Sequence, residues 1–367
     1  MEKITKRPCL EHITPYVPGK PIEEVKRELG VDEVIKLASN ENPLGPSTLA
    51  QKALKEFASK ISFYPDGNCY YLKNELASYL GVEESNIVMG NGADELITLV
   101  GLAYLNPNDE IIMAEPTFSE YEFSARLMDA TPIKVPSQDF RHDMKAIAAA
   151  VTDKTKIVFI CNPNNPTGTI VTREEMETFF KEIPPEVLVV IDEAYYEYAS
   201  DPKYPQSIEF LKEGYNVLIL RTFSKIYGLA GLRIGYGLAR ENIVTDINTV
   251  REPFNVNAVA QHAARAALKD EEHVKEGRRI NEEGKKYLAE EFERLNLFHL
   301  PTEANFVFVD VGVDSRKLFP KMLQKGVIVR TGDIFGYPDF IRLTIGTHEQ
   351  NRRFIEAFEE SVKELKG

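Results

Sequence analysis

Residues 187–195 read VLVVIDEAY, and this stretch decides the fold. Val187–Ile191 is an unbroken apolar run without the polar alternation of a strand that has one wet face. Such runs are typical of strands in a mostly parallel sheet that helices cover on both faces. Asp192 follows at once, at the carboxyl end of the strand, where sheets of this class bind their ligands. The stretch therefore predicts an α/β protein with a site at this strand end.

Similar apolar segments flank this run on both sides, and segments with helical periodicity separate them. The other predicted strands are 87–89, 110–114, 131–136, 156–161, 217–221 and 234–239. The predicted helices include 92–105, 118–129 and 172–182, the last of which opens with the capping box Thr172-Arg-Glu-Glu175. This βαβ alternation predicts a large domain with a seven-stranded, mostly parallel sheet covered by helices.

The remaining chain predicts a second, smaller α+β domain. After residue 257 come an alanine-rich helix to 269, a charged helix to 294, three strand-like segments and a closing helix, the strands being 305–311, 326–330 and 339–345. The N-terminal segment has a helix-like part and a strand-like part, 21–29 and 34–38, and we expect it to pack on the small domain. The expected division is an arm at 1–45, a large domain at 46–256 and a small domain at 257–367.

Composition excludes several classes of protein. The 367 residues include 44 Lys plus Arg and 57 Asp plus Glu, a net charge of −13, which argues against nucleic acid as a partner. The longest nearly apolar stretch, 96–105, falls short of the roughly 18 residues of a membrane span. The three cysteines lack metal-type spacing and no signal peptide precedes them, so we expect a soluble cytoplasmic protein without a metal site.

Five strand ends carry polar residues that core packing does not require: GNGAD (90–94), NPNNPTG (162–168), DEAY (192–195), RTFSK (221–225) and GLRIG (231–235). Because parallel strands end at the same edge, we expect these segments to converge. The first leads into a helix whose free N–H groups and dipole would hold a phosphate, although glycine turns before a helix are an equally good explanation.

Two of these segments supply reactive groups. Lys225 follows a buried strand, where partial desolvation favours the neutral, nucleophilic amine. Asp192 lies at a depth where a carboxylate needs a cation or hydrogen-bond donors, and a cationic ring nitrogen would serve, although a capping or ion-pairing aspartate is commoner. The strand end at 221 is expected to supply three cations and two hydroxyls to a small dianion, namely Arg221, Thr222, Ser224, Lys225 and Arg233.

The motifs NNPTG, DEAY, SK and GLRIG, in this order over about 75 residues, resemble those of the fold type I pyridoxal-phosphate aminotransferases. Four more segments look like the histidinol-phosphate aminotransferase subgroup: LASNENP (37–43), YPD (64–66), GNGADE (90–95) and IRLTIGT (341–347). The resemblance extends over nearly the whole chain.

The resemblance implies a pyridoxal 5'-phosphate site. It makes Lys225 the lysine that forms an imine with the cofactor and Asp192 the partner of the pyridine nitrogen. Asn165 and Tyr195 would hydrogen-bond the ring hydroxyl, and Phe118 would stack on the ring. The cofactor phosphate would be held by Gly92, Ala93, Asp94, Thr222, Ser224, Arg233 and, from the partner subunit of a homodimer with shared active sites, Tyr64.

The resemblance also implies the substrate contacts. Arg342 would clamp an α-carboxylate with its planar guanidinium, assisted by Asn42 and Asn165. From the residues alone, a strand residue paired on the surface is the preferred interpretation of Arg342. Tyr16 and Arg330 lie where the subgroup contacts the phosphate of its substrate.

The implied reaction is transamination of L-histidinol phosphate with 2-oxoglutarate, a step of histidine biosynthesis that gives imidazole-acetol phosphate and L-glutamate by ping-pong kinetics. The same scaffold also fits an aromatic amino acid aminotransferase or a threonine-phosphate decarboxylase, and the central motifs do not separate these. A more remote alternative is a non-catalytic phosphate-binding α/β protein, which would leave Lys225 and Asp192 unexplained.

Overall fold

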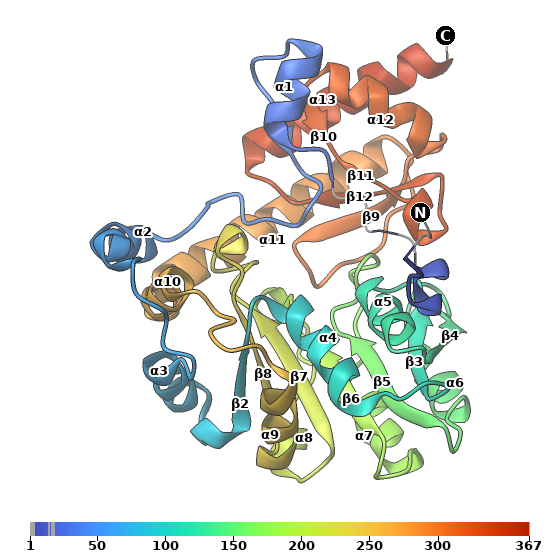
Figure 1. Ribbon diagram of the computed structural model, residues 1–367. Helices are drawn as coiled ribbons and strands as arrows, with labels where there is room; N and C mark the ends of the chain where they lie inside the picture. The colour runs from blue at the N-terminus through green and yellow to red at the C-terminus, as the bar shows by residue number, and fades with distance from the viewer. Residues whose placement is uncertain (1–3, 14, 16–18, 367) are drawn as a thin grey trace.

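The computed structural model describes residues 4–13, 15 and 19–366. Its main feature is a seven-stranded sheet in which only β8 runs against its neighbours (Figure 1). The strand order is β2 (Ile87–Gly90), β8 (Gly235–Ala239), β7 (Val217–Thr222), β6 (Leu188–Asp192), β5 (Thr155–Cys161), β3 (Glu110–Glu115) and β4 (Thr131–Pro136). The predicted large sheet, its strand number and its mostly parallel direction are confirmed.

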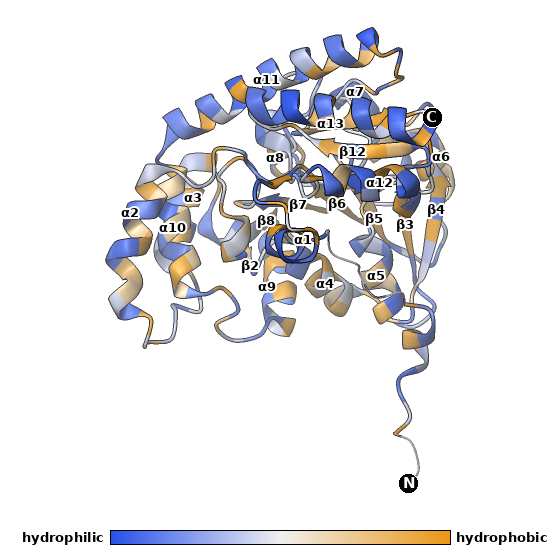
Figure 2. Ribbon diagram, turned by 90° about the horizontal axis from the view of Figure 1, so that it is seen from above, coloured by the Kyte–Doolittle hydropathy of each residue, from blue (hydrophilic) through white to orange (hydrophobic). Residues whose placement is uncertain are grey.

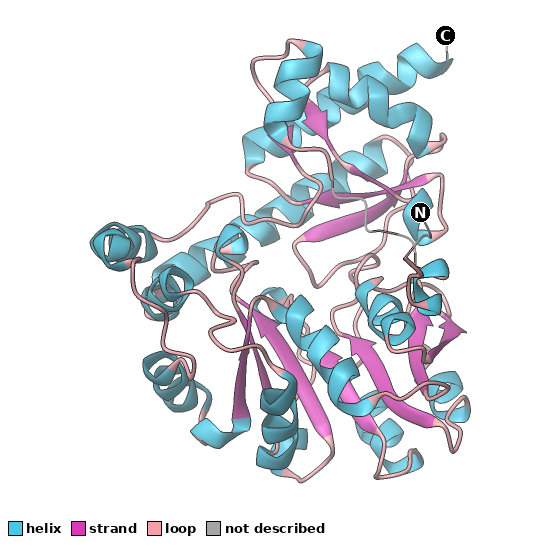
Figure 3. Cartoon of the chain, in the orientation of Figure 1, coloured by secondary structure: helices cyan, strands magenta, loops and turns pink. Residues whose placement is uncertain are grey.

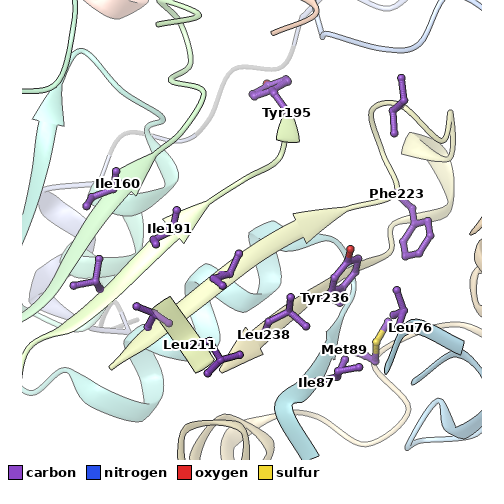
Figure 4. Close-up of a cluster of buried hydrophobic side chains, with 14 of the residues drawn as sticks. Leu76, Ile87, Met89, Ile160, Ile191, Tyr195, Leu211, Phe223, Tyr236 and Leu238 are labelled. Atoms are coloured by element: carbon purple, nitrogen blue, oxygen red, sulfur yellow. The ribbon is translucent and has the colours of Figure 1, made fainter. Parts of the chain in front are cut away.

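Helices cover both faces of this sheet, which explains the unbroken apolar run. Val189 and Ile191 point into one core, whereas Leu188 and Val190 point into the other. The first core is closed by α3 (Tyr70–Leu80), α6 (Met144–Ala149), α7 (Arg173–Glu182), α8 (Ile208–Lys212) and α10 (Ala258–Leu268). The second is closed by α4 (Ala93–Tyr104), α5 (Glu120–Leu127) and α9 (Glu241–Val250). Figure 4 shows part of the first core, where Ile191, Leu238 and Met89 lie along the sheet.

The predicted capping box is present at the start of α7. The Thr172 side chain accepts from the Glu175 backbone N–H, and the Glu175 carboxylate accepts from the Thr172 backbone N–H at 2.7 Å. These bonds satisfy two donors that a helix start otherwise leaves without a partner. The local sequence therefore sets where this helix begins.

A smaller α/β unit lies above the large sheet (Figures 1 and 3). It contains an antiparallel sheet of β11 (Arg330–Thr331), β12 (Phe340–Thr344) and β9 (Phe306–Asp310). Around it lie α11 (Glu271–Arg294), α12 (Ser315–Gln324) and α13 (His348–Lys366). In Figure 2, α11 and α13 carry much blue on the side toward the viewer.

The segment predicted as one strand at 326–330 is instead two short strands. β10 (Val327–Ile328) pairs in parallel with β1 (Ile35–Lys36), whereas β11 pairs with β12. The chain leaves the sheet with β1 and enters the sheet with β12 at Val329, so the two ends of one segment belong to different sheets. Sequence periodicity does not show this change of sheet, because the apolar residues Val327, Ile328 and Val329 are all buried and lead directly into β11.

Two helices near the expected domain boundaries show how the units pack. α1 (Ile22–Leu29) shares a small core with α12 and β10, through Val25, Leu323 and Ile328. α10 packs on α2 (Thr48–Phe57), and its buried alanines join the core of the large sheet. A division at residue 257 remains a proposal, and the packing of α10 favours a division closer to the start of α11.

Candidate active site

A cavity of about 300 Å³ lies at the carboxyl ends of β5, β6 and β7, between the large sheet and strands β11 and β12. The predicted site residues that line it are Ala93, Asp94, Phe118, Asn165, Asp192, Tyr195, Thr222, Ser224, Lys225, Arg233, Arg330 and Arg342. Polar residues from five separate strand ends and from the small sheet therefore converge on one site, as the motif positions predicted.

Lys225 lies in the turn that follows β7, and its Nζ donates to the Ser39 carbonyl at 3.1 Å. The ammonium is 5.6 Å from the centre of the Tyr195 ring. Burial is the main cause that lowers the pKa of Lys225 to about 8, and the nearby Arg342 guanidinium lowers it further. A substantial fraction of this amine is consequently neutral near pH 8, as a nucleophile or general base requires.

Asp192 is the last residue of β6 and is buried. Its Oδ2 accepts from the Tyr121 hydroxyl at 2.7 Å, and its Oδ1 accepts from the Ala194 backbone N–H at 3.1 Å. Burial raises the pKa of Asp192 to about 6, and these two bonds oppose the rise. A cation placed against this carboxylate would favour its ionised form, so the site fits a protonated ring nitrogen.

One end of the cavity is built to hold an anion. Gly92 precedes α4 with φ +85°, and a Cβ atom there would lie 2.5 Å from the Arg233 guanidinium. Arg233 in turn contacts Asp94 at 3.1 Å and donates to the Ser224 hydroxyl at 3.4 Å. The start of a helix, a guanidinium and the Ser224 and Thr222 hydroxyls thus surround one space, which fits a phosphate.

Arg221 does not belong to this anion site, which corrects the expectation of three cations at the strand end. Its side chain points to the opposite face of the sheet, because successive strand residues alternate and Thr222 faces the cavity. There its Nε donates to the Glu193 carboxylate at 2.8 Å, and its guanidinium stacks on the Tyr196 ring at 3.6 Å. The Arg221 and Glu193 side chains are both buried, so Arg221 belongs to the packed core behind the site.

The middle of the cavity carries groups suited to a flat polar ring. The Tyr195 hydroxyl accepts from the Asn40 side-chain amide at 2.9 Å, and the Asn165 Oδ1 accepts from Arg342 at 2.6 Å. Phe118 lines the cavity and meets Tyr121 edge-on, with the ring centres 5.7 Å apart. The arrangement fits pyridoxal phosphate, whose ring nitrogen Asp192 would hold, whose aldehyde carbon Lys225 would bond and whose phosphate the start of α4 would hold.

Arg330 and Arg342 are paired residues on adjacent antiparallel strands, β11 and β12. Both line the cavity, and Arg342 is buried, with a second bond to the Ala38 carbonyl at 2.7 Å. Because directly opposed residues project from the same face of a sheet, the two guanidinium groups enter the cavity together. This location excludes the alternative of Arg342 as a surface strand residue.

Of the predicted site residues that the structure describes, three besides Arg221 do not line this cavity: Gly92, which precedes α4 at its edge, Asn42 and Tyr64. Asn42 is buried beside it, and its side chain donates to the Ile226 carbonyl at 2.7 Å. Tyr64 is 83% exposed and stacks on Phe254 with ring centres 4.9 Å apart. Tyr16 lies outside the described residues.

Sequence reasoning missed two residues that hold the site together. Asn40 contacts Tyr195 and also Thr344 of β12, with its backbone at φ +56°. It lies within the quoted segment LASNENP, which was the available signal. Tyr121 contacts Asp192 from α5, and no motif singled it out because the bond joins residues 71 positions apart.

Within the described part of the chain, no helix is long and apolar enough to cross a membrane. The same residues contain no group of three or more His, Cys, Asp or Glu side chains placed to hold a metal ion.

The fold and the site define an enzyme of the fold type I class. The chain belongs to the aminotransferase class I and II family, whose sequence profile matches residues 32–358. It is 60% identical to a histidinol-phosphate aminotransferase of Moorella thermoacetica, over 96% of this chain and 92% of that protein. It is 49% identical to a histidinol-phosphate aminotransferase of Caldicellulosiruptor saccharolyticus, over 96% of this chain and 99% of that protein.

Solved structures agree with this family. The histidinol-phosphate aminotransferase of Sinorhizobium meliloti in complex with pyridoxal-5'-phosphate has a TM-score of 0.90 and 28% identity, covering 98% of this chain and 97% of that one. A L-threonine-O-3-phosphate decarboxylase from Porphyromonas gingivalis has a TM-score of 0.80 at 23% identity, over 90% of this chain and all of that one, which is a likeness of fold alone. Family membership removes the alternative of a non-catalytic binding protein.

Proposed function

We propose that this chain is a pyridoxal-phosphate-dependent histidinol-phosphate aminotransferase. It would convert L-histidinol phosphate and 2-oxoglutarate into imidazole-acetol phosphate and L-glutamate. The observation that carries this proposal is the placement of Lys225 and Asp192 in one cavity with the Arg330–Arg342 pair. The identity of 60% to a relative of that name supports the same substrate.

When bound, pyridoxal phosphate supplies an electron sink for the charge that develops at the substrate's α-carbon. Asp192 would hold a positive charge on the ring nitrogen, since its carboxylate is buried and fixed through both oxygens. The start of α4, Ser224 and Arg233 would hold the phosphate end. Asn165 and Tyr195 would contact the ring hydroxyl, and Phe118 would cover the ring face.

Lys225 would act both as the nucleophile that attaches the cofactor and as the base that moves the α-proton. Its lowered pKa, about 8, makes the amine able to accept and return a proton near neutral pH. The donor carries a phosphate ester, whereas the acceptor carries two carboxylates. We assign the α-carboxylate to Arg342 and the substrate phosphate to Arg330, with Tyr16 beside it.

The proposal includes a cytoplasmic homodimer in which Tyr64 of one subunit reaches the cofactor phosphate of the other. The 83% exposure of Tyr64 supports this, because exposed apolar side chains that gather in one segment mark a contact surface for another protein chain. Apolar side chains of the same segment are also exposed, namely Ile61, Phe63, Tyr70 and Tyr71.

A parallel assay tests the substrate. The purified holoenzyme is given histidinol phosphate, phenylalanine or threonine phosphate, each with 2-oxoglutarate, and glutamate and carbon dioxide are measured. We expect the highest kcat/KM for histidinol phosphate and no carbon dioxide. A higher kcat/KM for phenylalanine would make the chain an aromatic aminotransferase, and release of carbon dioxide from threonine phosphate would make it a decarboxylase.

A second test addresses Lys225. The Lys225→Ala variant should purify folded, lack turnover and lack the visible absorption band that borohydride bleaches in the wild-type protein. Turnover by this variant would refute the assigned role.

A further inference from the structure

Tyr121 lies behind the site, and its ring and its hydroxyl are both held by contacts. It is fully buried in the first turn of α5, and its ring stacks on Phe159 of β5 at 4.6 Å and an interplanar angle of 9°. Its other ring contact is the edge-on one with Phe118. Two aromatic contacts therefore fix where the phenol oxygen lies.

The phenol oxygen of Tyr121 is hydrogen-bonded to Asp192, the carboxylate that is proposed to contact the ring nitrogen of the cofactor. The Tyr121 hydroxyl donates to Asp192 Oδ2 at 2.7 Å, while the Ala194 N–H holds Oδ1 at 3.1 Å. One bond on each oxygen fixes the plane of the carboxylate. Tyr121 does not line the cavity, so it can act on a ligand only through its neighbours.

The charge of Asp192 depends on the same bond. Burial disfavours the ionised carboxylate, and the bond from Tyr121 is the strongest influence that opposes burial. The other titratable or charged groups that face this site, among the described residues, are Cys161 on β5, Tyr195 after β6, Asp94 on α4, Lys225 after β7, Arg233 before β8 and Arg342 on β12. Asp94 disfavours the ionised form of Asp192, whereas Lys225 favours it.

We propose that Tyr121 is a positioning residue that fixes the orientation and the ionised state of Asp192 toward the cofactor. None of the sequence motifs quoted above includes Tyr121. The inference rests on the proposed role of Asp192 as the partner of the cofactor ring nitrogen.

The test is the Tyr121→Phe variant, which keeps both ring contacts and removes only the hydroxyl. Loss of a bond to the ionised carboxylate raises the pKa of Asp192, so the acid limb of the kcat/KM profile should move to higher pH, by about half a unit or more. Cofactor affinity, measured by absorbance after dialysis, should fall several-fold more at pH 6 than at pH 8.

Tyr104→Phe is the matched control. The Tyr104 hydroxyl donates to Asp246 Oδ2 at 2.8 Å, so this variant removes the same kind of bond on the outer side of α4. It should leave the acid limb and the cofactor affinity unchanged. A purely structural role for Tyr121 predicts a lower melting temperature with an unshifted acid limb, and that result would overturn the inference.

Asp192→Asn separates this inference from the function on which it rests. If Asp192→Asn loses cofactor affinity and turnover whereas Tyr121→Phe behaves as wild type, the proposed role of Tyr121 is wrong and that of Asp192 stands. If Asp192→Asn retains normal cofactor affinity and turnover, the role of Asp192 itself is wrong.

Discussion

Lys225 illustrates how a proposed catalytic residue can lower the stability of the fold. In the unfolded chain its pKa is near 10.5, whereas in the fold it is about 8, so the folded state binds a proton less readily. Between these two values the unfolded state holds more protons, and stability rises with pH. Burial of the ammonium therefore costs stability below pH 8, and this cost disappears as the pH approaches 10.5.

We predict that cofactor-free Lys225→Met is more stable than the cofactor-free wild type at pH 7, by up to about 3 kcal/mol. The difference should shrink steadily between pH 8 and pH 10.5. Urea denaturation at several pH values measures it. Lys52→Met, at a side chain 74% exposed, is the control and should change little. A constant difference across the pH range would mean that packing, and not charge, is responsible.

Arg330 is predicted to determine the choice of substrate. Its loss in Arg330→Ala should reduce kcat/KM for histidinol phosphate more than for phenylalanine, by about 2–3 kcal/mol, or roughly 30- to 150-fold, because a charge-assisted bond to a phosphate is removed. Both substrates are measured at one ionic strength. Equal losses on the two substrates would leave Arg330 with a structural role only.

At the scale of single residues, the sequence predicts a site residue well when that residue directly follows a predicted strand. Asp192 and Lys225 follow apolar runs directly, so their depth and their common edge could be inferred before the structure. Tyr121 and Asn40 reach the site from a helix and from the N-terminal segment. Their roles depend on contacts across 71 and 155 residues, which a single sequence does not contain.

At the scale of elements, alternation along a strand decides which of two neighbouring residues meets the ligand. Thr222 and Arg221 are adjacent, yet Thr222 faces the cavity and Arg221 faces the core with Glu193. The seven strands were predictable because short, mostly apolar segments alternate along the chain with segments of helical periodicity. The face of each strand was not predictable, because both faces are buried and the residues show no polar alternation.

The start of α4 gives a prediction at this scale. Gly92→Ala places a Cβ against the Arg233 guanidinium in addition to straining the backbone at φ +85°. We expect cofactor affinity, measured by equilibrium dialysis, to fall at least tenfold. Gly214→Ala is the control, since Gly214 has φ +90° and open space around its Cβ position. It should lower the melting temperature similarly and leave cofactor affinity intact. Equal affinity in the two variants would place the phosphate elsewhere.

At the scale of the whole molecule, the proposed sharing of sites between subunits gives a complementation test. Tyr64→Phe should weaken cofactor retention modestly through loss of its hydroxyl. In mixed dimers of a Tyr64→Ala variant with a Lys225→Ala variant, one of the two sites carries both changes and the other carries neither. Activity should therefore recover above that of either parent. If mixing restores no activity, the placement of Tyr64 in the neighbouring site is wrong.

The pairing of β1 with β10 has a consequence for how the chain is made. Ile35 and Lys36 leave the ribosome almost 300 residues before their strand partners, Val327 and Ile328. The large sheet, in contrast, is complete once residue 239 has emerged. The large sheet, with the proposed phosphate site and Lys225, is therefore synthesised first. Strand β1, although it is made earlier still, can pair only after β10 has been synthesised. Because Arg330 and Arg342 come with that late segment, we expect the residues of this chain that are proposed to hold the cofactor to be in place before those proposed to bind the substrate.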